Sequence, residues 1–129
     1  MKKLILIAFA FFMMSICSVA ASAQVTRIHF APGATSKVVT GTLRGWKSHR
    51  KYVIFVKKGQ TLTTESVKNS ITIGIDAPPG STYEQDMAAD CHDRNEVTPT
   101  ARGDYGITVT ECKKADPWRG TFKFKVVVR

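Results

Sequence analysis

The chain has 129 residues, of which 43% are hydrophobic and 22% are charged, and Lys and Arg outnumber Asp and Glu by 19 to 10. This length fits one globular domain, and the composition excludes a multidomain enzyme and a low-complexity disordered protein. The formal net charge of +9 either favours anionic partners or serves only to keep the protein in solution.

Residues 1–23 differ in character from the rest and predict a cleavable signal peptide. Lys2 and Lys3 form a positive start, an uncharged apolar run follows over residues 4–16, and Ala-Ser-Ala at 21–23 is a small-residue cleavage motif. Cleavage would leave a single domain, residues 24–129, in the periplasm or secreted, without a membrane span and with the net charge lowered to +7 by the loss of the two lysines. An uncleaved membrane anchor is the rival interpretation, which the short apolar run disfavours. Export also argues against a nucleic-acid partner.

Short alternating or β-branched segments separated by turn residues recur along the rest of the chain and predict an all-β fold. Strands are expected at 28–30, 36–43, 52–56, 61–67, 71–75, 105–109 and 122–128. This spacing indicates a small antiparallel β-sandwich of about seven or eight strands, with a small barrel as the alternative. The continuous apolar run at 52–56 predicts a central strand covered on both faces.

Two segments fall outside this pattern. Residues 81–102 form one long loop without strand character, with a helical turn or two expected near 83–89. Residues 113–120 are expected to form a hairpin loop between the last two strands.

Cysteine usage agrees with export. Cys17 leaves with the signal peptide, so Cys91 and Cys112 are expected to form one disulfide. Closing a loop of this length is worth about 3 kcal/mol in the chain-entropy model. A zinc site is disfavoured, because the Cys91-His92 dipeptide lacks the spacing of a four-ligand set.

No catalytic motif is present, so the sequence predicts a binding protein and no enzyme, without cofactor or metal. The three histidines are interpreted as surface residues. The polar cluster of Asp90, His92, Asp93 and Glu96 lacks the alternation of a calcium loop and is interpreted as a solvated acidic segment.

Two loops combine residue types that are common at protein interfaces. The candidate partner-binding residues are Arg102, Gly103, Asp104 and Tyr105 in the first loop, and Lys113, Lys114, Trp118 and Arg119 in the second. The disulfide is expected to bring both loops to one end of the domain as a single rigid, cationic surface. The alternative for Trp118 is that its ring folds back over the end of the sandwich.

About two thirds of residues 24–129 resembles a known family. The matching segments are Gly33-Ala34-Thr35-Ser36, Gly41-Thr42-Leu43-Arg44-Gly45, Tyr52-Val53-Ile54-Phe55 with Lys57-Lys58-Gly59-Gln60, and Gly103-Asp104-Tyr105. They resemble the periplasmic inhibitors of g-type lysozyme and, more loosely, those of i-type lysozyme.

The resemblance implies a secreted β-sandwich that protects peptidoglycan by placing a loop in the lysozyme substrate cleft. The family loop is usually Ser-Gly-x-Tyr, and Arg102 stands here in place of the serine, which puts the serine's contact and the choice of target in doubt. The alternative function is a non-catalytic domain that binds an anionic envelope component, such as peptidoglycan or lipopolysaccharide, or another exported protein.

Overall fold

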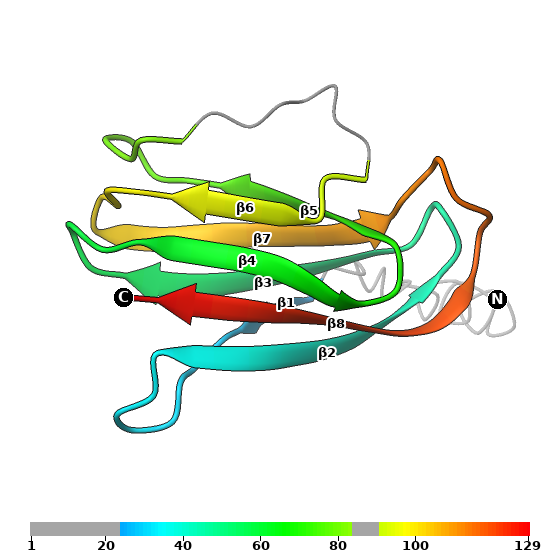
Figure 1. Ribbon diagram of the computed structural model, residues 1–129, viewed down its shortest axis with the longest axis horizontal. Helices are drawn as coiled ribbons and strands as arrows, with labels where there is room; N and C mark the ends of the chain where they lie inside the picture. The colour runs from blue at the N-terminus through cyan, green and yellow to red at the C-terminus, as the bar shows by residue number, and fades with distance from the viewer. Residues whose placement is uncertain (1–23, 84–90) are drawn as a thin grey trace, which may run out of the picture.

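Eight β-strands form two four-stranded sheets that pack face to face in the computed structural model, which describes residues 24–83 and 91–129 (Figure 1). The first sheet has the order β1-β3-β7-β5, with β1 at Val25–Arg27, β3 at His49–Val56, β7 at Gly103–Glu111 and β5 at Ile71–Asp76. The second has the order β2-β8-β4-β6, with β2 at Ser36–Arg44, β8 at Arg119–Val128, β4 at Leu62–Lys68 and β6 at Arg94–Val97. The expected sandwich is confirmed, and all strand pairs except β1–β3 are antiparallel.

The predicted signal peptide and most of the predicted helical segment at 83–89 lie outside the described residues. Among the residues that the structure describes, no helical segment has the length and hydropathy that a bilayer span requires.

The core forms where the alternating side chains of the two sheets meet. Phe122, Phe124 and Val126 of β8 point inward and are fully buried, and Tyr105 and Ile107 of β7 face them from the other sheet. Alternation places every second side chain of a strand on the same face, which is why the sequence pattern identified these strands correctly.

Gly41 is required by this packing. It lies inside β2 directly opposite Phe122 of β8. A Cβ atom at this position would collide with the Phe122 ring and with the Tyr52 hydroxyl. The missing side chain therefore makes room for two core aromatic rings.

The expectation that residues 52–56 are covered on both faces is wrong. Tyr52, Ile54 and Val56 are buried, whereas Phe55 is 46% exposed on the outer face of the first sheet. β3 is central within its sheet, but only its inner face meets the second sheet. The apolar residues at 52–56 thus form one buried face of β3 and leave the Phe55 ring exposed on the other.

The long segment at 81–102 contains a strand that the sequence did not predict. β6 pairs with β4, and its Asn95 and Val97 point inward while Arg94 and Glu96 point outward. Only one of the two inward residues is apolar. The four residues of β6 therefore lack the alternation of apolar and polar residues that predicts a strand. At the other end of the chain, the expectation of a strand at 28–30 is wrong. The first strand, β1, ends at Arg27 and pairs in parallel with β3.

A further correction concerns residues 113–120. β7 belongs to the first sheet and β8 to the second, so the segment between them crosses from one sheet to the other and is not a hairpin loop. β8 itself already begins at Arg119.

Polar side chains close the two open sides of the sandwich. Asn95 donates from Nδ2 to the Ile73 carbonyl at 2.8 Å, and its Oδ1 accepts a hydrogen bond from the Tyr83 hydroxyl. On the opposite side, Arg50 of β3 donates from Nε to the Thr42 carbonyl of β2 at 3.0 Å. The Asn95 and Arg50 side chains each satisfy a backbone carbonyl that the sheet edge leaves free.

Candidate functional site

The two predicted contact loops lie at opposite ends of the sandwich. Arg102 precedes the first residue of β7 and Cys112 follows the last, so a nine-residue strand of about 30 Å separates them (Figure 1). The expectation of a single combined surface is therefore wrong, because the disulfide joins Cys112 to Cys91 at the end remote from Arg102. We call these the Arg102 end, with Arg102, Gly103, Asp104 and Tyr105, and the Trp118 end, with Lys113, Lys114, Trp118 and Arg119.

Hydrogen bonds between neighbouring loops fix the backbone at the Arg102 end. Thr100 is buried, and its hydroxyl donates to the Lys57 carbonyl at 2.7 Å and accepts from the Gln60 backbone N–H at 2.9 Å. The backbone adds bonds from Gly59 N–H to the Thr100 carbonyl and from Thr100 N–H to the Gln60 carbonyl, at 2.8 and 2.9 Å. The turn after β3 and the segment before β7 are thus joined as one unit.

Tyr105 holds this unit from the core side. Its side chain is fully buried, and its hydroxyl donates to the Ala101 carbonyl at 2.9 Å and is also hydrogen-bonded to the Ser81 hydroxyl. The Ala101 N–H in turn donates to Ser81 Oγ at 3.2 Å. The tyrosine of the predicted contact loop therefore positions the backbone that carries Arg102, and its own side chain is covered.

Arg102 presents a cation on an aromatic platform. Its guanidinium carbon lies 5.4 Å from the centre of the Phe55 ring, which is within the range of a cation–π contact. Both side chains are exposed. The stacking restricts the guanidinium to one region of the surface without using its hydrogen-bond donors.

Asp104 is held in place by a bidentate ion pair with Arg27 of β1. Arg27 donates from Nη1 and Nη2 to the two carboxylate oxygens, at 2.9 and 3.0 Å. This hydrogen bonding lowers the pKa of Asp104 below its usual value and raises that of Arg27. Asp104 lies directly opposite Phe55 in the β3–β7 pair, so the ion pair borders the Arg102–Phe55 platform.

A small notch adjoins this platform. It has a volume of about 200 Å³ and is lined by Arg27, Ile28, His29, Phe30, Ile54 and Phe55. The Arg102 end thus combines an exposed aromatic ring, a stacked cation and a small recess of mixed polar and apolar lining.

The Trp118 end is fixed in a different way. The Cys91 and Cys112 Cα atoms are 4.5 Å apart and the disulfide between them is formed, as expected. Trp118 is half-buried and packs against the core, as in the alternative interpretation of the sequence. Its backbone N–H donates to Oε1 of Glu111 at 2.7 Å, and that carboxylate is almost completely buried.

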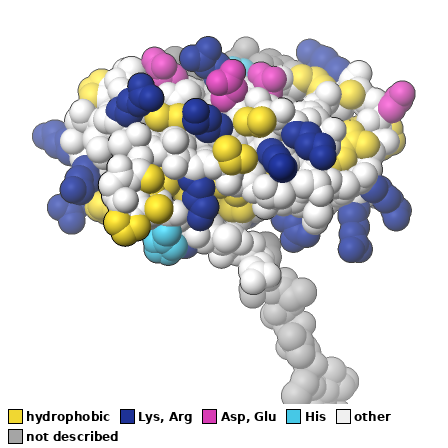
Figure 2. Space-filling model, turned by 60° about the horizontal axis from the view of Figure 1, so that its bottom comes forward, with side chains coloured by type: hydrophobic (Ala, Val, Ile, Leu, Met, Phe, Trp, Pro, Cys, Tyr) yellow, Lys and Arg dark blue, Asp and Glu magenta, His cyan; other side chains and the backbone are white. Residues whose placement is uncertain are grey.

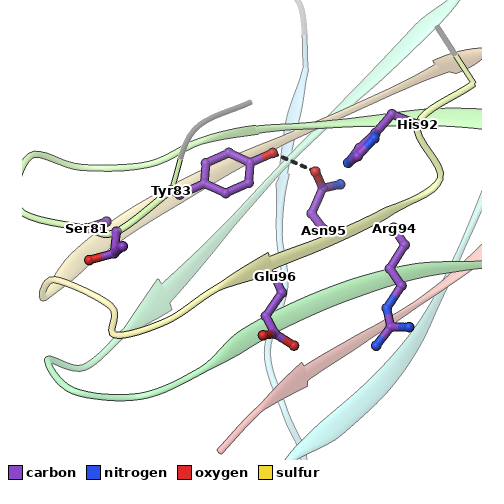
Figure 3. A pocket seen from close by; sticks show the side chains of 7 residues that line it. Ser81, Tyr83, His92, Arg94, Asn95 and Glu96 are labelled. Carbon is purple, nitrogen blue, oxygen red and sulfur yellow. Dashed lines mark hydrogen bonds between the residues drawn. The ribbon is translucent and has the colours of Figure 1, made fainter. Parts of the chain in front are cut away.

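A wider hollow lies on neither of these ends. It has a volume of about 960 Å³, is lined by Ser81, Thr82, Tyr83, His92, Arg94, Asn95 and Glu96, and contains the Tyr83–Asn95 hydrogen bond (Figure 3). Its lining is mostly polar and comes from residues 81–83 and 92–96. In Figure 3 the His92 side chain points toward Asn95, whereas the Glu96 side chain points away from the Tyr83–Asn95 hydrogen bond. Among the described residues, no group of three His, Cys, Asp or Glu side chains is arranged to hold a metal.

Three exposed residues of interest were not among the sequence candidates. Phe55 was interpreted as core because of its apolar neighbours. Arg27 was not a candidate because nothing in the sequence links it to Asp104, which lies 77 positions away. Trp46, which is 45% exposed, lies in the turn between β2 and β3. The sequence holds no signal that separates it from Trp118, which also lies in a polar connection but packs against the core.

The geometry defines the class of this chain as an eight-stranded, disulfide-linked β-sandwich. No protein-family model matches the chain, and neither does any curated protein sequence. Solved structures do. The chain is similar to PliG of Aeromonas hydrophila, a periplasmic inhibitor of g-type lysozyme, with a TM-score of 0.62, 20% identity, and coverage of 81% of this chain and 96% of that one.

Two further structures of the same kind agree. PliG of Salmonella Typhimurium matches with a TM-score of 0.60, 16% identity, and coverage of 84% and 100% of the two chains. A mutant of the Escherichia coli protein matches with a TM-score of 0.58, 17% identity and the same coverage. The resemblance seen in the sequence therefore holds for the fold of almost the whole described domain.

Proposed function

We propose that this protein is a periplasmic, non-catalytic inhibitor of lysozyme that blocks the substrate cleft with its Arg102 end. The observation that carries the proposal is the shared fold with three inhibitors of g-type lysozyme over more than four fifths of the chain. The inhibited enzyme would be one that cuts peptidoglycan, so the protein would protect the cell wall.

The Arg102 end supports this role through its chemistry. Enzymes that hydrolyse glycosidic bonds place a pair of carboxylic acids in the cleft. A guanidinium offers donors in a geometry that suits a carboxylate, and such bonds strengthen when water is excluded. Arg102, stacked on Phe55, is ordered before binding, which reduces the entropy lost on association.

Only one end of the sandwich can enter a cleft at a time. The Trp118 end has its tryptophan packed inward, whereas the Arg102 end exposes its cation and aromatic ring together. We therefore assign the inhibitory contact to Arg102, Gly103 and Asp104, and not to Lys113, Lys114, Trp118 and Arg119.

Long-range electrostatics opposes such a complex when the lysozyme is itself basic, since the mature chain would carry a net charge of +7 after loss of Lys2 and Lys3 from the +9 of the full sequence. Local complementarity must then outweigh the repulsion between net charges. Inhibition that strengthens with added salt, at a fixed contact geometry, would be consistent with this balance.

Lysis of a cell-wall suspension by g-type, i-type and c-type lysozymes tests the proposal. We expect stoichiometric loss of g-type activity, and a rise in the inhibition constant of about 30-fold for Arg102→Ala, which corresponds to roughly 2 kcal/mol for a central contact. Arg119→Ala removes the same charge at the other end and should change the constant by less than about twofold. Undiminished lysis at a large molar excess of inhibitor would refute the function, and equal effects of the two variants would refute the assignment to the Arg102 end.

A further inference from the structure

The Trp118 end carries cations that the proposed inhibitory contact does not use. Its cationic cluster consists of Arg44, Lys47, Lys113, Lys114 and Arg119, all of them exposed. Within the described ranges, the only ion pair closer than 4 Å is that between Arg27 and Asp104, so none of these five side chains has a carboxylate partner there. Figure 2 shows Lys and Arg side chains both in the middle and at the margins of the visible face, with fewer Asp and Glu.

Two of these cations are placed unfavourably for the fold alone. Arg44 of β2 and Arg119 of β8 lie directly opposite each other in the antiparallel pair. Side chains opposite each other in this way share a face of the sheet, and like charges in such a pair destabilise it. A multivalent anion outside the protein would remove this repulsion, so the arrangement favours an external anionic partner.

An exposed tryptophan lies within the cluster. Trp46 stands between Arg44 and Lys47 in the connection from β2 to β3, and 45% of its surface is exposed. A tryptophan with an apolar body and one polar N–H is favoured at the boundary between lipid headgroups and water. Cations alone would indicate any polyanion, and the neighbouring indole favours a lipid surface.

Both loops of the cluster are ordered before any partner binds. The β2–β3 connection is closed by a bond from Ser48 N–H to the Gly45 carbonyl at 3.0 Å, and the other loop by a bond from Ala115 N–H to the Cys112 carbonyl at 3.2 Å. The disulfide and the Glu111–Trp118 bond hold the base of the second loop. The two loops lie at the same end of the sandwich, next to each other in Figure 1.

We propose that the Trp118 end docks on the surface of an anionic phospholipid bilayer, with Trp46 at headgroup depth and the five cations against lipid phosphates. Basic side chains near such a surface gain from its negative potential, and an aromatic anchor adds an apolar contribution. The docked protein would leave the Arg102 end, about 30 Å away along β7, directed to the aqueous side. The inference requires export to the periplasm but does not require lysozyme inhibition.

Co-sedimentation of the exported protein with vesicles is the test. We expect retention by vesicles containing equal parts of phosphatidylglycerol and phosphatidylcholine, loss of retention in high salt, and none with phosphatidylcholine alone. Arg44→Gln/Arg119→Gln should lower the partition coefficient roughly 30-fold, since each charge is worth about fivefold near the surface. Lys57→Gln/Lys58→Gln removes two charges at the opposite end and is the matched control, with a change of less than about threefold expected.

The chain's two tryptophans supply an independent readout. In Trp118→Phe, Trp46 is the only tryptophan left, and its emission should shift to shorter wavelength with the anionic vesicles alone. Equal effects of the two double variants, an unshifted Trp46 emission during sedimentation, or retention by lipopolysaccharide but not by these vesicles would each overturn the proposal. Lysozyme inhibition by Arg44→Gln/Arg119→Gln should remain at the wild-type level, so failure of the inhibitor function and failure of lipid docking are separable.

Discussion

The two ends of this sandwich are ordered by different means. At the Arg102 end, hydrogen bonds join neighbouring loops, and the cations have partners within the chain, Asp104 for Arg27 and the Phe55 ring for Arg102. At the Trp118 end a disulfide joins the chain, and the cations face solvent without a described acidic partner. The cations of the first end are thus held by partners within the chain, whereas those of the second end are free for the external anion that we propose.

The comparison also separates stability from function. The covalent tie lies remote from the residues to which we assign inhibition, so the disulfide stabilises the domain without shaping that contact directly. The loops at the Arg102 end depend on buried polar bonds centred on Thr100 and Tyr105. Changes at one end should therefore leave the behaviour of the other end intact.

Removal of the disulfide has the largest expected effect. Cys91→Ser/Cys112→Ser should lower the free energy of unfolding by about 3 kcal/mol, because the 21-residue loop is no longer closed in the unfolded chain. Urea unfolding, followed by tryptophan fluorescence, measures this loss. While the variant remains folded, its inhibition constant should equal that of the wild type. A large loss of inhibition by folded protein would show that the two ends are coupled.

Loss of the Thr100 hydroxyl should cost less but act on function. Thr100→Val keeps the shape of the side chain and removes both of its bonds, leaving the Lys57 carbonyl and the Gln60 N–H without this partner. The expected cost is about 1–3 kcal/mol in unfolding free energy, with a weaker inhibitor as the turn loosens.

Thr61→Val is the matched control for that variant. The Thr61 hydroxyl is hydrogen-bonded to the Thr98 hydroxyl at 2.8 Å in the same region, but this bond is exposed, so water replaces the lost partner. Equal destabilisation by the two substitutions would show that burial of the Thr100 bonds is not what fixes this end.

The sequence predicted most of the strands because alternation directly reports which face is buried. Phe122, Phe124 and Val126 are an example, since each lies on the inner face of β8. β6 escaped prediction because its inner face holds Asn95, a polar residue that is satisfied only by partners distant in sequence. The topology of the last two strands was wrong for a related reason, as no local pattern distinguishes a hairpin from a crossing between sheets.

The candidate site was harder to predict than the fold. The proposed single surface ignored the length of the strand between Arg102 and Cys112, which alone places the two loops at opposite ends. Tyr105 looked like a contact residue beside Arg102, but the alternation of β7 turns it into the core. The Arg27–Asp104 pair joins β1 to β7, which lie on either side of β3 in the sheet but are far apart in the sequence. No local sequence pattern therefore indicates the pair.

The smallest effect is expected for the exposed ion pair at the Arg102 end. The hydrogen bonds from Arg27 lower the pKa of Asp104 in the folded protein below the ordinary value of an aspartate. A carboxyl group with a lowered folded pKa stabilises the protein above its unfolded pKa, and this stabilisation is lost as the pH falls through the folded value. Asp104→Asn should therefore have a slightly lower Tm than the wild type at pH 6, and the two proteins should converge as the pH falls through the lowered pKa of Asp104. High salt should reduce the difference at pH 6, because the pair is exposed to solvent. A difference in Tm that persisted unchanged into strong acid would show that Asp104 acts through its shape and not through its charge.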